Sequence, residues 1–492
     1  MNQPWNNKPI TYLIIILVIA ITLRVVFYTG VNFNDDLVYL NFAHDITAGK
    51  FHPHPYIFAT RLLMQYPIAF FFLLFGVSEF SATLYLILAS LGTIIFTYLI
   101  GRELFNNTTG LLAALLLAFL PLDIIYSTTI APDVPTAFYL ALSVYLFIIG
   151  NKKNNKLLQY SSGIAIGLAW FVKNLAVVYA LLFIGYFILE LITKKERFFK
   201  TLKPYLFVAS GLISILIIEG VIYASLGYSF LTVFEVNNEH YTTTLLGVNR
   251  DLRYYPAQLF NYDSLGKYFH YIGYYFYFSL LSISLILFKK RKEAYILIIW
   301  LLPITLFLQY GSMSITQYLL IQRIYRFLTI ISVPMCLLIA YYIANINFKM
   351  DKFIKPSLMI ILLVTSLVYT YNAHIYLYKS MADTKLSAEF LSSQEPKNIF
   401  ADETTIGYYN FFFSYKKEQF LKKLDYVKSI DEVHDSYVVI NANRGYVELP
   451  NLRSRLPSFM YPIPHDWKLL HIVTESDIDA YRAYNTSIYY VP

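Results

Sequence analysis

Residues 10–29 read ITYLIIILVIAITLRVVFYT and contain a single charged residue, Arg24. About 20 predominantly apolar residues are needed for an α-helix to cross the hydrocarbon core of a bilayer. The stretch is longer than the apolar core of a signal peptide, and no small-x-small cleavage pattern follows it. It therefore predicts a transmembrane helix that stays in the mature chain.

The same pattern recurs along the 492 residues, of which 57% are hydrophobic and only 14% are charged. A soluble domain is about a quarter charged, and single cores stop growing near 250–300 residues, so this much apolar sequence requires lipid as a second solvent. Apolar runs predict eleven transmembrane helices, with the long run 160–193 divided into two at Lys173-Asn174. The others are expected near 10–29, 79–101, 108–126, 134–150, 204–226, 268–288, 294–310, 323–346 and 356–373.

The orientation follows from the distribution of the net charge of +8. With the N-terminus inside, the connectors on the inner side carry most of the Lys and Arg, as in 152–156, 194–203, 289–292 and 349–355, which satisfies the positive-inside rule. We expect a multi-pass protein of the cell membrane with a cytoplasmic N-terminus. Basic residues confined to such loops indicate membrane orientation rather than nucleic-acid binding. The single cysteine, Cys336, excludes a disulfide framework.

Three regions are then expected outside the membrane. The first loop, 30–78, contains the interrupted apolar stretch Pro55–Gly76, which predicts an amphipathic helix at the interface. The loop 227–267 is polar and aromatic. The tail 374–492 gains charge and strand-like stretches such as Tyr437–Asn441, so we expect a small extracytoplasmic α/β domain after a helical membrane domain at 1–373.

Two adjacent acids, Asp35 and Asp36, directly follow the first helix. Carboxylates at a membrane surface are costly to desolvate unless a neighbouring group uses them. They fit a general base, or a group that orients an acceptor hydroxyl. They equally fit the N-terminal cap of a helix over 37–46. One acid can serve each role.

Four cations, Lys173, Arg323, Arg326 and Arg24, are expected near the outer ends of predicted helices. A single cation there usually snorkels to the headgroups. Four on one leaflet favour a site for the phosphate of a lipid-linked donor. Glu219 is an acid inside a predicted helix, which indicates either a functional residue or a buried hydrogen bond. No third ligand accompanies His52-Pro53-His54, so we predict a solvated loop there and no metal site.

Several motifs in order along the chain resemble one family. They are Arg24 followed by Asp35-Asp36-Leu37-Val38-Tyr39, then Leu74-Phe75-Gly76-Val77-Ser78-Glu79, Gly101-Arg102-Glu103-Leu104-Phe105, Asp133, Gly163 and Gly167 before Lys173, and Arg326-Phe327-Leu328. This pattern is similar to that of the GT-C glycosyltransferases, in the superfamily of protein O-mannosyltransferases and aminoarabinose (lipid A) transferases. The resemblance implies a GT-C-like fold with about eleven transmembrane helices.

The resemblance also implies an activity, the transfer of a sugar from a polyprenyl-phosphate donor to a lipid, glycan or protein acceptor at the outer face, with inversion. Asp35 matches the catalytic base of the family, with Asp36 beside it. Lys173 and Arg326 match positions associated with the donor phosphate. The lysine signature of the aminoarabinose branch is absent, and Arg61 in its place is a candidate substitute for that lysine. Tyr39, Asp133 and Glu219 are candidates for substrate contact. One base and a cation cluster suffice chemically, so a divalent cation is compatible but not required.

Two other classes also use outer-face charges. A transporter or flippase is expected to show repeats and charges at mid-depth, and neither is evident in the sequence. An O-antigen ligase or polymerase acts on polyprenyl-linked glycans and remains an alternative. The Trp-Trp-Asp motif of oligosaccharyltransferases is absent, because the only tryptophans are Trp5, Trp170, Trp300 and Trp467.

Overall fold

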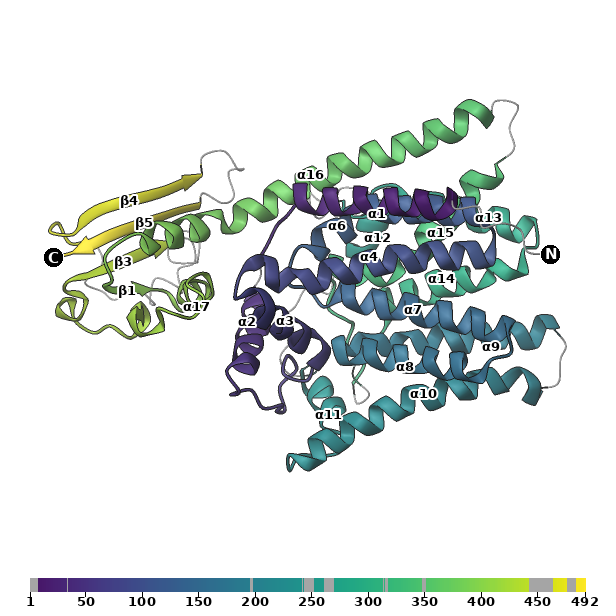
Figure 1. The fold of residues 1–492 in the computed structure, drawn as a ribbon, viewed down its shortest axis with the longest axis horizontal. Coiled ribbons are helices and arrows are strands. Elements are labelled where there is room, and N and C mark those ends of the chain that lie inside the picture. Colours follow the sequence, from purple (N-terminus) through teal and green to yellow (C-terminus); the bar gives the residue numbers. More distant parts are fainter. Residues whose placement is uncertain are drawn as a thin grey trace.

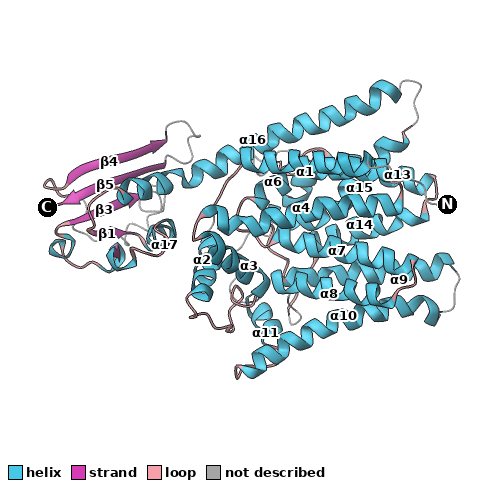
Figure 2. Cartoon of the chain, in the orientation of Figure 1, coloured by secondary structure: helices cyan, strands magenta, loops and turns pink. Residues whose placement is uncertain are grey.

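The computed structural model describes residues 8–32, 34–194, 198–240, 242, 252–260, 270–312, 314, 317–346, 351–441, 463–475 and 484–492. A bundle of long helices forms the larger part of the molecule, and a small sheet domain lies beyond one end of it (Figure 1). The N-terminal end of α1 lies at the opposite end of the bundle. Figure 2 shows that strands occur only in the small domain within the described ranges. The predicted fold class is confirmed.

The helices follow the predicted apolar runs closely. Their bounds are α1 (Lys8–Val26), α2 (Asn34–Thr47), α3 (Leu62–Phe75), α4 (Glu79–Leu104), α5 (Asn107–Phe119), α6 (Pro121–Ser127), α7 (Asp133–Lys152), α8 (Lys156–Val172), α9 (Ala180–Lys194), α10 (Phe198–Ser225), α11 (Thr232–Glu239), α12 (Tyr254–Leu259), α13 (Tyr275–Phe288), α14 (Tyr295–Tyr310), α15 (Ser332–Asn345), α16 (Asp351–Ser392) and α17 (Glu403–Phe412).

By length and composition, eight helices of the described chain can cross a membrane, or nine if the bent pair α5–α6 is one span. The remaining two of the eleven predicted segments also fall on helices, α8 with 17 residues and α13 with 14. The prediction was too long at α13, because residues 270–274 precede the helix. The stretch Pro55–Gly76, predicted as an interfacial helix, contains the shorter helix α3. This helix exposes an apolar face of Tyr66, Phe70, Leu73, Leu74 and Phe75.

Two breaks in the bundle have visible causes in the sequence. Pro121 begins α6, and the chain bends by 58° between α5 and α6, since proline fixes φ and suits the first position of a new helix. At the predicted division of 160–193, α8 ends at Val172 and Lys173 is extended, with φ −159° and ψ 125°. The 3₁₀ helix η1 (Asn174–Tyr179) then leads into α9. Lys173 therefore lies at a helix end.

Glycines set the approach of α8 to α10. A Cβ atom on Gly163 would lie 1.9 Å from the Val208 carbonyl oxygen, and one on Gly211 would lie 2.1 Å from that of Tyr160. Small residues allow such close backbone packing, which supplies much of the van der Waals energy between membrane helices. The glycines therefore fix the position of α8, whose last turn leads to Lys173.

The last membrane helix, α16, is much longer than the predicted segment 356–373. It has 42 residues, which at about 1.5 Å per residue is about 63 Å, or twice the hydrocarbon thickness. Hydropathy marks only the part at membrane depth, and the continuation past residue 373 is polar enough to be missed. Figure 1 shows α16 running from the bundle into the sheet domain as one element.

The C-terminal domain is built on five strands in the order β2-β1-β3-β5-β4. They are β1 (Asn398–Ala401), β2 (Leu421–Lys423), β3 (Ser436–Asn441), β4 (Lys468–Glu475) and β5 (Tyr484–Val491). The first three pair in parallel, and β5 pairs antiparallel with β3 and β4. β3 is the strand predicted at Tyr437–Asn441. The end of α16 and α17 pack on one face of the sheet, and the other face buries Trp467.

This domain docks onto helices α2 and α3 of the first loop. Tyr408 and Phe411 of α17 share one buried core with Leu40 of α2, Phe72 of α3 and Met381 of α16. At the rim, the Tyr415 ring stacks on His44 with centroids 3.9 Å apart. Its hydroxyl donates to Asn41 Oδ1 at 2.8 Å. The tail domain therefore supports the helix that begins with the two acids.

The His44–Tyr415 stack predicts a pH-dependent stability. Burial lowers the pKa of His44, opposed by Asp45 and Glu418 and reinforced by Lys50. Protonation is thus less favourable in the folded chain, and stability falls as the pH drops through the ordinary value of 6.5. Between about pH 7.5 and about pH 5.5, thermal unfolding of the full chain should shift down more in the wild type than in His44→Phe, which keeps the stack. Equal shifts would contradict the expectation.

Candidate active site

Four charged side chains from four separate segments form a continuous chain at the end of the bundle that carries α2. The Arg326 Nη2 atom donates to Asp35 Oδ2 at 2.8 Å, and its Nε lies 3.5 Å from Asp133 Oδ2. The Lys173 Nζ atom lies 2.5 Å from Asp133 Oδ1. Lys173 also lies over the Phe327 ring, 3.7 Å from its centroid. The charges alternate in the order Asp35, Arg326, Asp133, Lys173, and these four residues are called the charged chain below.

Local structure explains how these groups meet. Asp35 lies in the first turn of α2, and Asp133 is the first residue of α7, so each carboxylate lies at a helix N-terminus, which favours negative charge. Lys173 follows the last residue of α8. Arg326 lies in the 3₁₀ helix η4 (Tyr325–Ile331), which precedes α15. All four positions fall at one end of the bundle because the helices alternate in direction.

The two adjacent acids have different environments. Asp35 is 38% exposed and faces Arg326. Asp36 is fully buried, and its Oδ2 accepts the backbone N–H of Asn32 at 2.9 Å. Asp36 therefore fixes the turn that enters α2, in the manner of a capping residue. Of the pair, Asp35 is the carboxylate that a substrate can reach.

Arg61 joins the cluster from the connection before α3. It donates to the Tyr39 hydroxyl, and its guanidinium lies 5.0 Å from the centroid of the Phe58 ring. Burial raises the pKa of Tyr39 to about 12, with Arg61 opposing the rise. Tyr39 therefore stays protonated at physiological pH and is able to donate a hydrogen bond. Lys173, Arg61 and Arg326 interact electrostatically, so three predicted cations lie together.

The structure also adds two residues that the sequence did not single out. His240, directly after α11, interacts electrostatically with Arg61 and Asp35. Burial lowers its pKa, Arg61 lowers it further and Asp35 opposes the change. Tyr126 of α6 interacts electrostatically with Arg326 and Asp133. Neither residue carried a sequence signal, because one lies in the polar loop 227–267 and the other in an apolar run.

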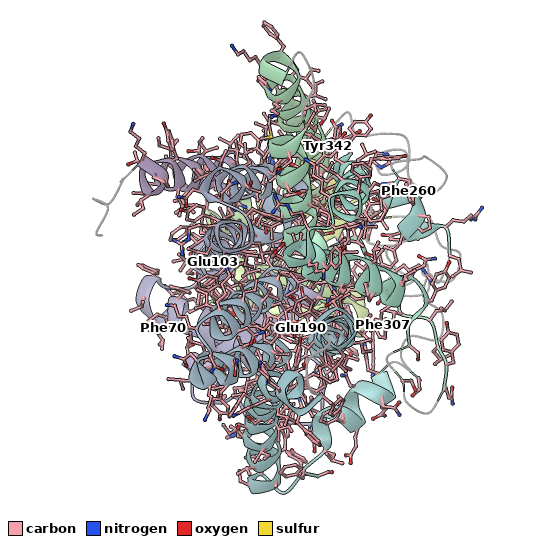
Figure 3. All side chains as sticks on the ribbon, turned by 90° about the vertical axis from the view of Figure 1, so that its right-hand side faces the viewer. Phe70, Glu103, Glu190, Phe260, Phe307 and Tyr342 are labelled. Carbon is pink, nitrogen blue, oxygen red and sulfur yellow. The ribbon has the colours of Figure 1, made fainter. Side chains whose placement is uncertain are left out.

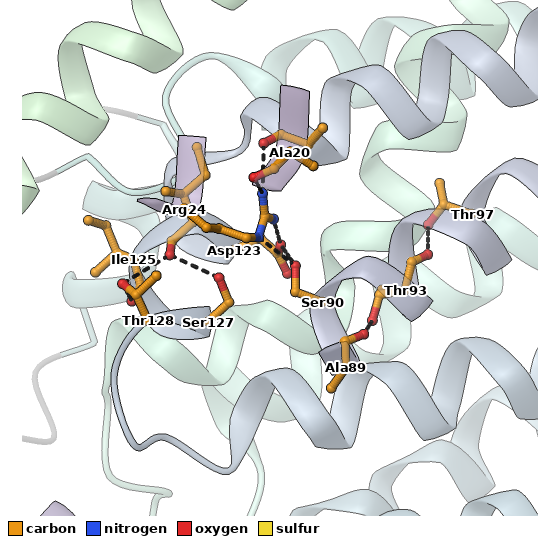
Figure 4. Close-up of polar contacts among 12 residues, drawn as sticks. Ala20, Arg24, Ala89, Ser90, Thr93, Thr97, Asp123, Ile125, Ser127 and Thr128 are labelled. Carbon is orange, nitrogen blue, oxygen red and sulfur yellow. Dashed lines mark hydrogen bonds and ion pairs between the residues drawn. The ribbon is translucent and has the colours of Figure 1, made fainter. Parts of the chain in front are cut away.

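Arg24 lies elsewhere, inside the bundle (Figure 4). It forms an ion pair with Asp123 of α6, and both side chains are 1% exposed. Its Nε donates to Ser90 Oγ at 3.0 Å, and Ser90 donates to Asp123 Oδ2 at 2.5 Å. The guanidinium is thus neutralised and hydrogen-bonded by its neighbours. This arrangement ties α1 to α4 and α6 and leaves Arg24 apart from the charged chain.

Two further predicted residues also have buried hydrogen bonds of their own. Arg323 is buried, and its Nη2 donates to the Gln309 carbonyl oxygen at 2.7 Å. Glu219 of α10 accepts the indole N–H of Trp170 at 2.8 Å and is buried. These contacts link α14 to the segment before η4 and α10 to α8. In the predicted metal-free loop, His54 Nδ1 lies 3.0 Å from the His52 carbonyl oxygen.

The described chain has the architecture of a polytopic membrane protein, and its fold is similar to that of GT-C glycosyltransferases. Residues 53–220 match the family model described as dolichyl-phosphate-mannose-protein mannosyltransferase. A comparison with curated protein sequences finds no match. The predicted resemblance to the GT-C superfamily is confirmed by this family match and by the solved structures of similar fold.

Three solved structures illustrate the likeness. ArnT from Cupriavidus metallidurans bound to undecaprenyl phosphate has a TM-score of 0.62 and 10% identity, over 97% of this chain and 98% of that chain. The same protein in the apo state has a TM-score of 0.59 and 12% identity, over 97% of this chain and 97% of that chain. The third is the archaeal oligosaccharyltransferase AglB from Archaeoglobus fulgidus, in complex with an inhibitory peptide and a dolichol-phosphate. It has a TM-score of 0.54 and 12% identity, over 89% of this chain and 70% of that chain. At these identities the likeness concerns the fold.

Proposed function

We propose that the protein is a membrane glycosyltransferase that moves a sugar from a polyprenyl-phosphate donor to an acceptor hydroxyl. The observation that carries the proposal is the charged chain Asp35–Arg326–Asp133–Lys173, with one accessible carboxylate at its end. The family model at 53–220 and the lipid phosphates named for ArnT and AglB support a donor of this class. We place the site at the outer face of the cell membrane, with the N-terminus cytoplasmic.

The charges of the cluster suit a phosphodiester. Three cations, Lys173, Arg326 and Arg61, stand against two carboxylates, Asp35 and Asp133, so the cluster carries one net positive charge. A sugar phosphodiester carries one negative charge. Arg326 Nε is buried and lies 3.5 Å from Asp133 Oδ2 without a hydrogen bond in the described chain, so its N–H can turn to a phosphate oxygen. Preorganised cations stabilise the charge that develops on a departing phosphate.

The reaction follows from this arrangement. The bond between the anomeric carbon and the phosphate oxygen breaks through an oxocarbenium-like state. The acceptor oxygen bonds to the opposite face of the anomeric carbon, so a β-linked donor gives an α-linked product. Asp35 takes the proton of the acceptor hydroxyl. The polyprenyl phosphate leaves as an anion held by Arg326 and Lys173, and it needs no general acid.

A transfer assay tests the function. Purified full-length protein in lipid nanodiscs, given polyprenyl-phosphate donors with labelled sugars and an extract of envelope acceptors, should release polyprenyl phosphate and move label to an acceptor. A transporter or flippase would carry intact donor across a vesicle membrane without cleaving it. Translocation of uncleaved donor, with no transfer across a panel of donors, would overturn the proposal.

Replacing Arg326 tests the donor site. Arg326→Ala removes a charge-assisted contact to the donor phosphate worth about 1.5–3 kcal/mol, so donor affinity should fall by about tenfold to a hundredfold. Acceptor affinity should change much less. Arg323→Ala, three residues earlier and bound to the Gln309 carbonyl, is the matched control, and its donor affinity per folded protein should stay near the wild-type value. Equal losses in the two variants would make Arg326 a packing residue.

A further inference from the structure

A polar cavity lies at the end of the bundle opposite the charged chain, on the face that Figure 3 looks onto. Its volume is ≈ 390 Å³, and it lies between the ends of α7, α8, α9 and α10. α8 runs from this cavity to Lys173, and its 17 residues correspond to about 25 Å. The cavity is therefore separated from the charged chain by the depth of the membrane.

Three lysines line this cavity, Lys156 on α8 and Lys200 and Lys203 on α10. Among the described residues, the one acid of the lining is Glu190, which lies among the helix ends in Figure 3. Glu190 accepts a hydrogen bond from Tyr205 at 2.7 Å. Three cations against one carboxylate leave the lining positive, and at the predicted inner face such a site attracts anionic lipid headgroups.

A buried hydroxyl provides an independent sign of a ligand. The Thr201 side chain lines the cavity and the residue is only 6% exposed. Its Oγ1 has no hydrogen-bond partner within the described residues. A buried polar atom without a partner costs about 1–3 kcal/mol, so such atoms are normally paired. An oxygen of a bound phosphate would accept this hydroxyl.

The surroundings point to a lipid rather than to a soluble anion. Leu157 follows Lys156, and Leu206 lies beside the lining residue Phe207, and both leucines are exposed. An adjoining cavity of ≈ 430 Å³ shares Glu190 and has apolar lining residues such as Phe147 and Leu189. A headgroup in the polar cavity would thus have apolar surface beside it for its acyl chains.

We propose that this cavity binds the phosphate headgroup of an anionic phospholipid of the inner leaflet, held by the three lysines and by the Thr201 hydroxyl. The lipid would bridge the ends of α8 and α10 across the membrane from the charged chain. The proposal does not depend on the glycosyl transfer, because the lipid here is a resident of the membrane and neither donor nor acceptor.

Native mass spectrometry of the purified full chain tests the proposal. Phosphatidylglycerol should bind more tightly than phosphatidylcholine with the same acyl chains. Thr201→Val keeps the side-chain shape and removes one hydrogen bond, so phosphatidylglycerol affinity should fall by about threefold to tenfold. Stability of the lipid-free protein should not fall, because an unpartnered hydroxyl has been removed. Lower lipid-free stability with unchanged lipid affinity would mean that the hydroxyl only supports the fold.

Charge variants complete the test. The triple variant K156Q/K200Q/K203Q should lose phosphatidylglycerol affinity by about tenfold or more. The matched control K289Q/K290Q/K352Q removes the same charge on the same face outside the cavity. Its phosphatidylglycerol affinity should stay within about twofold of the wild-type value, because distant charges are screened. Equal losses in both triples would reduce the effect to general surface charge. A last measurement uses inorganic phosphate and wild-type protein in phosphatidylcholine nanodiscs. If inorganic phosphate bound as tightly as phosphatidylglycerol, the lipid assignment would be overturned.

Discussion

Asp35→Asn should reduce sugar transfer by about 10²- to 10⁴-fold, the usual contribution of a general base. The substitution keeps the shape of the side chain and its place beside Arg326, so the fold should remain. Donor binding should be equal or tighter, because one negative charge leaves a site that receives a phosphate. The measurements are single-turnover transfer and donor affinity on the same purified sample.

Asp36→Asn is the matched control for this experiment. Asp36 is buried and accepts the Asn32 N–H, and the amide oxygen of asparagine can accept the same bond. Transfer per folded molecule should therefore stay close to wild type, even if stability falls. Near-normal turnover in Asp35→Asn would exclude Asp35 as the base, and a loss confined to Asp36→Asn would reverse the assignment of the two acids.

Arg24→Ala should be among the most destabilising single substitutions in the bundle. It leaves the carboxylate of Asp123 buried at 1% exposure without its cation, and breaking a buried pair in this way costs about 3–5 kcal/mol. The double variant Arg24→Met with Asp123→Leu removes both charges and fills the space with apolar side chains. It should be much more stable than either single variant, as judged by thermal unfolding in detergent.

The same double variant separates a structural Arg24 from a phosphate-binding one. If Arg24 only holds α1 against α6, the folded double variant keeps its donor affinity and its transfer rate. A double variant that folds but loses about tenfold or more in donor affinity would instead support the role suggested by the motif. Additive losses in the two single variants would show that the ion pair contributes no coupling.

The bundle was predictable because hydrophobic length is a direct physical requirement of the bilayer. Each apolar run gave a helix, and Lys173-Asn174 marked a true break because a charged pair interrupts an otherwise continuous run. The part of a helix that extends beyond the membrane is under no such requirement, so hydropathy does not mark where it ends. The continuation of α16 and the short α13 were therefore misjudged, as was the start of α3, where the chain of residues 55–61 is not helical.

The candidate site was predictable one residue at a time but not as an arrangement. Asp35, Lys173 and Arg326 were singled out by position and by motif. Asp133, the common partner of Lys173 and Arg326, was expected only as a substrate contact, because pairing across the sequence leaves no local trace. For the same reason Arg24 was grouped with the outer cations, since its partner Asp123 lies 99 positions away. His240 lay in a loop whose composition said little.

The long helix α16 makes the tail and the membrane bundle one mechanical unit. Past the bundle, Lys385 of this helix pairs with Glu79 at 2.8 Å and donates to the Thr29 carbonyl oxygen at 3.0 Å. Glu79 in turn accepts the Val31 N–H, just before α2. α16 thus holds the segment that leads into α2, the helix that carries Asp35. Exchanging the C-terminal domain between related proteins would consequently change the position of the Asp35 carboxylate as well as the surface that an acceptor meets.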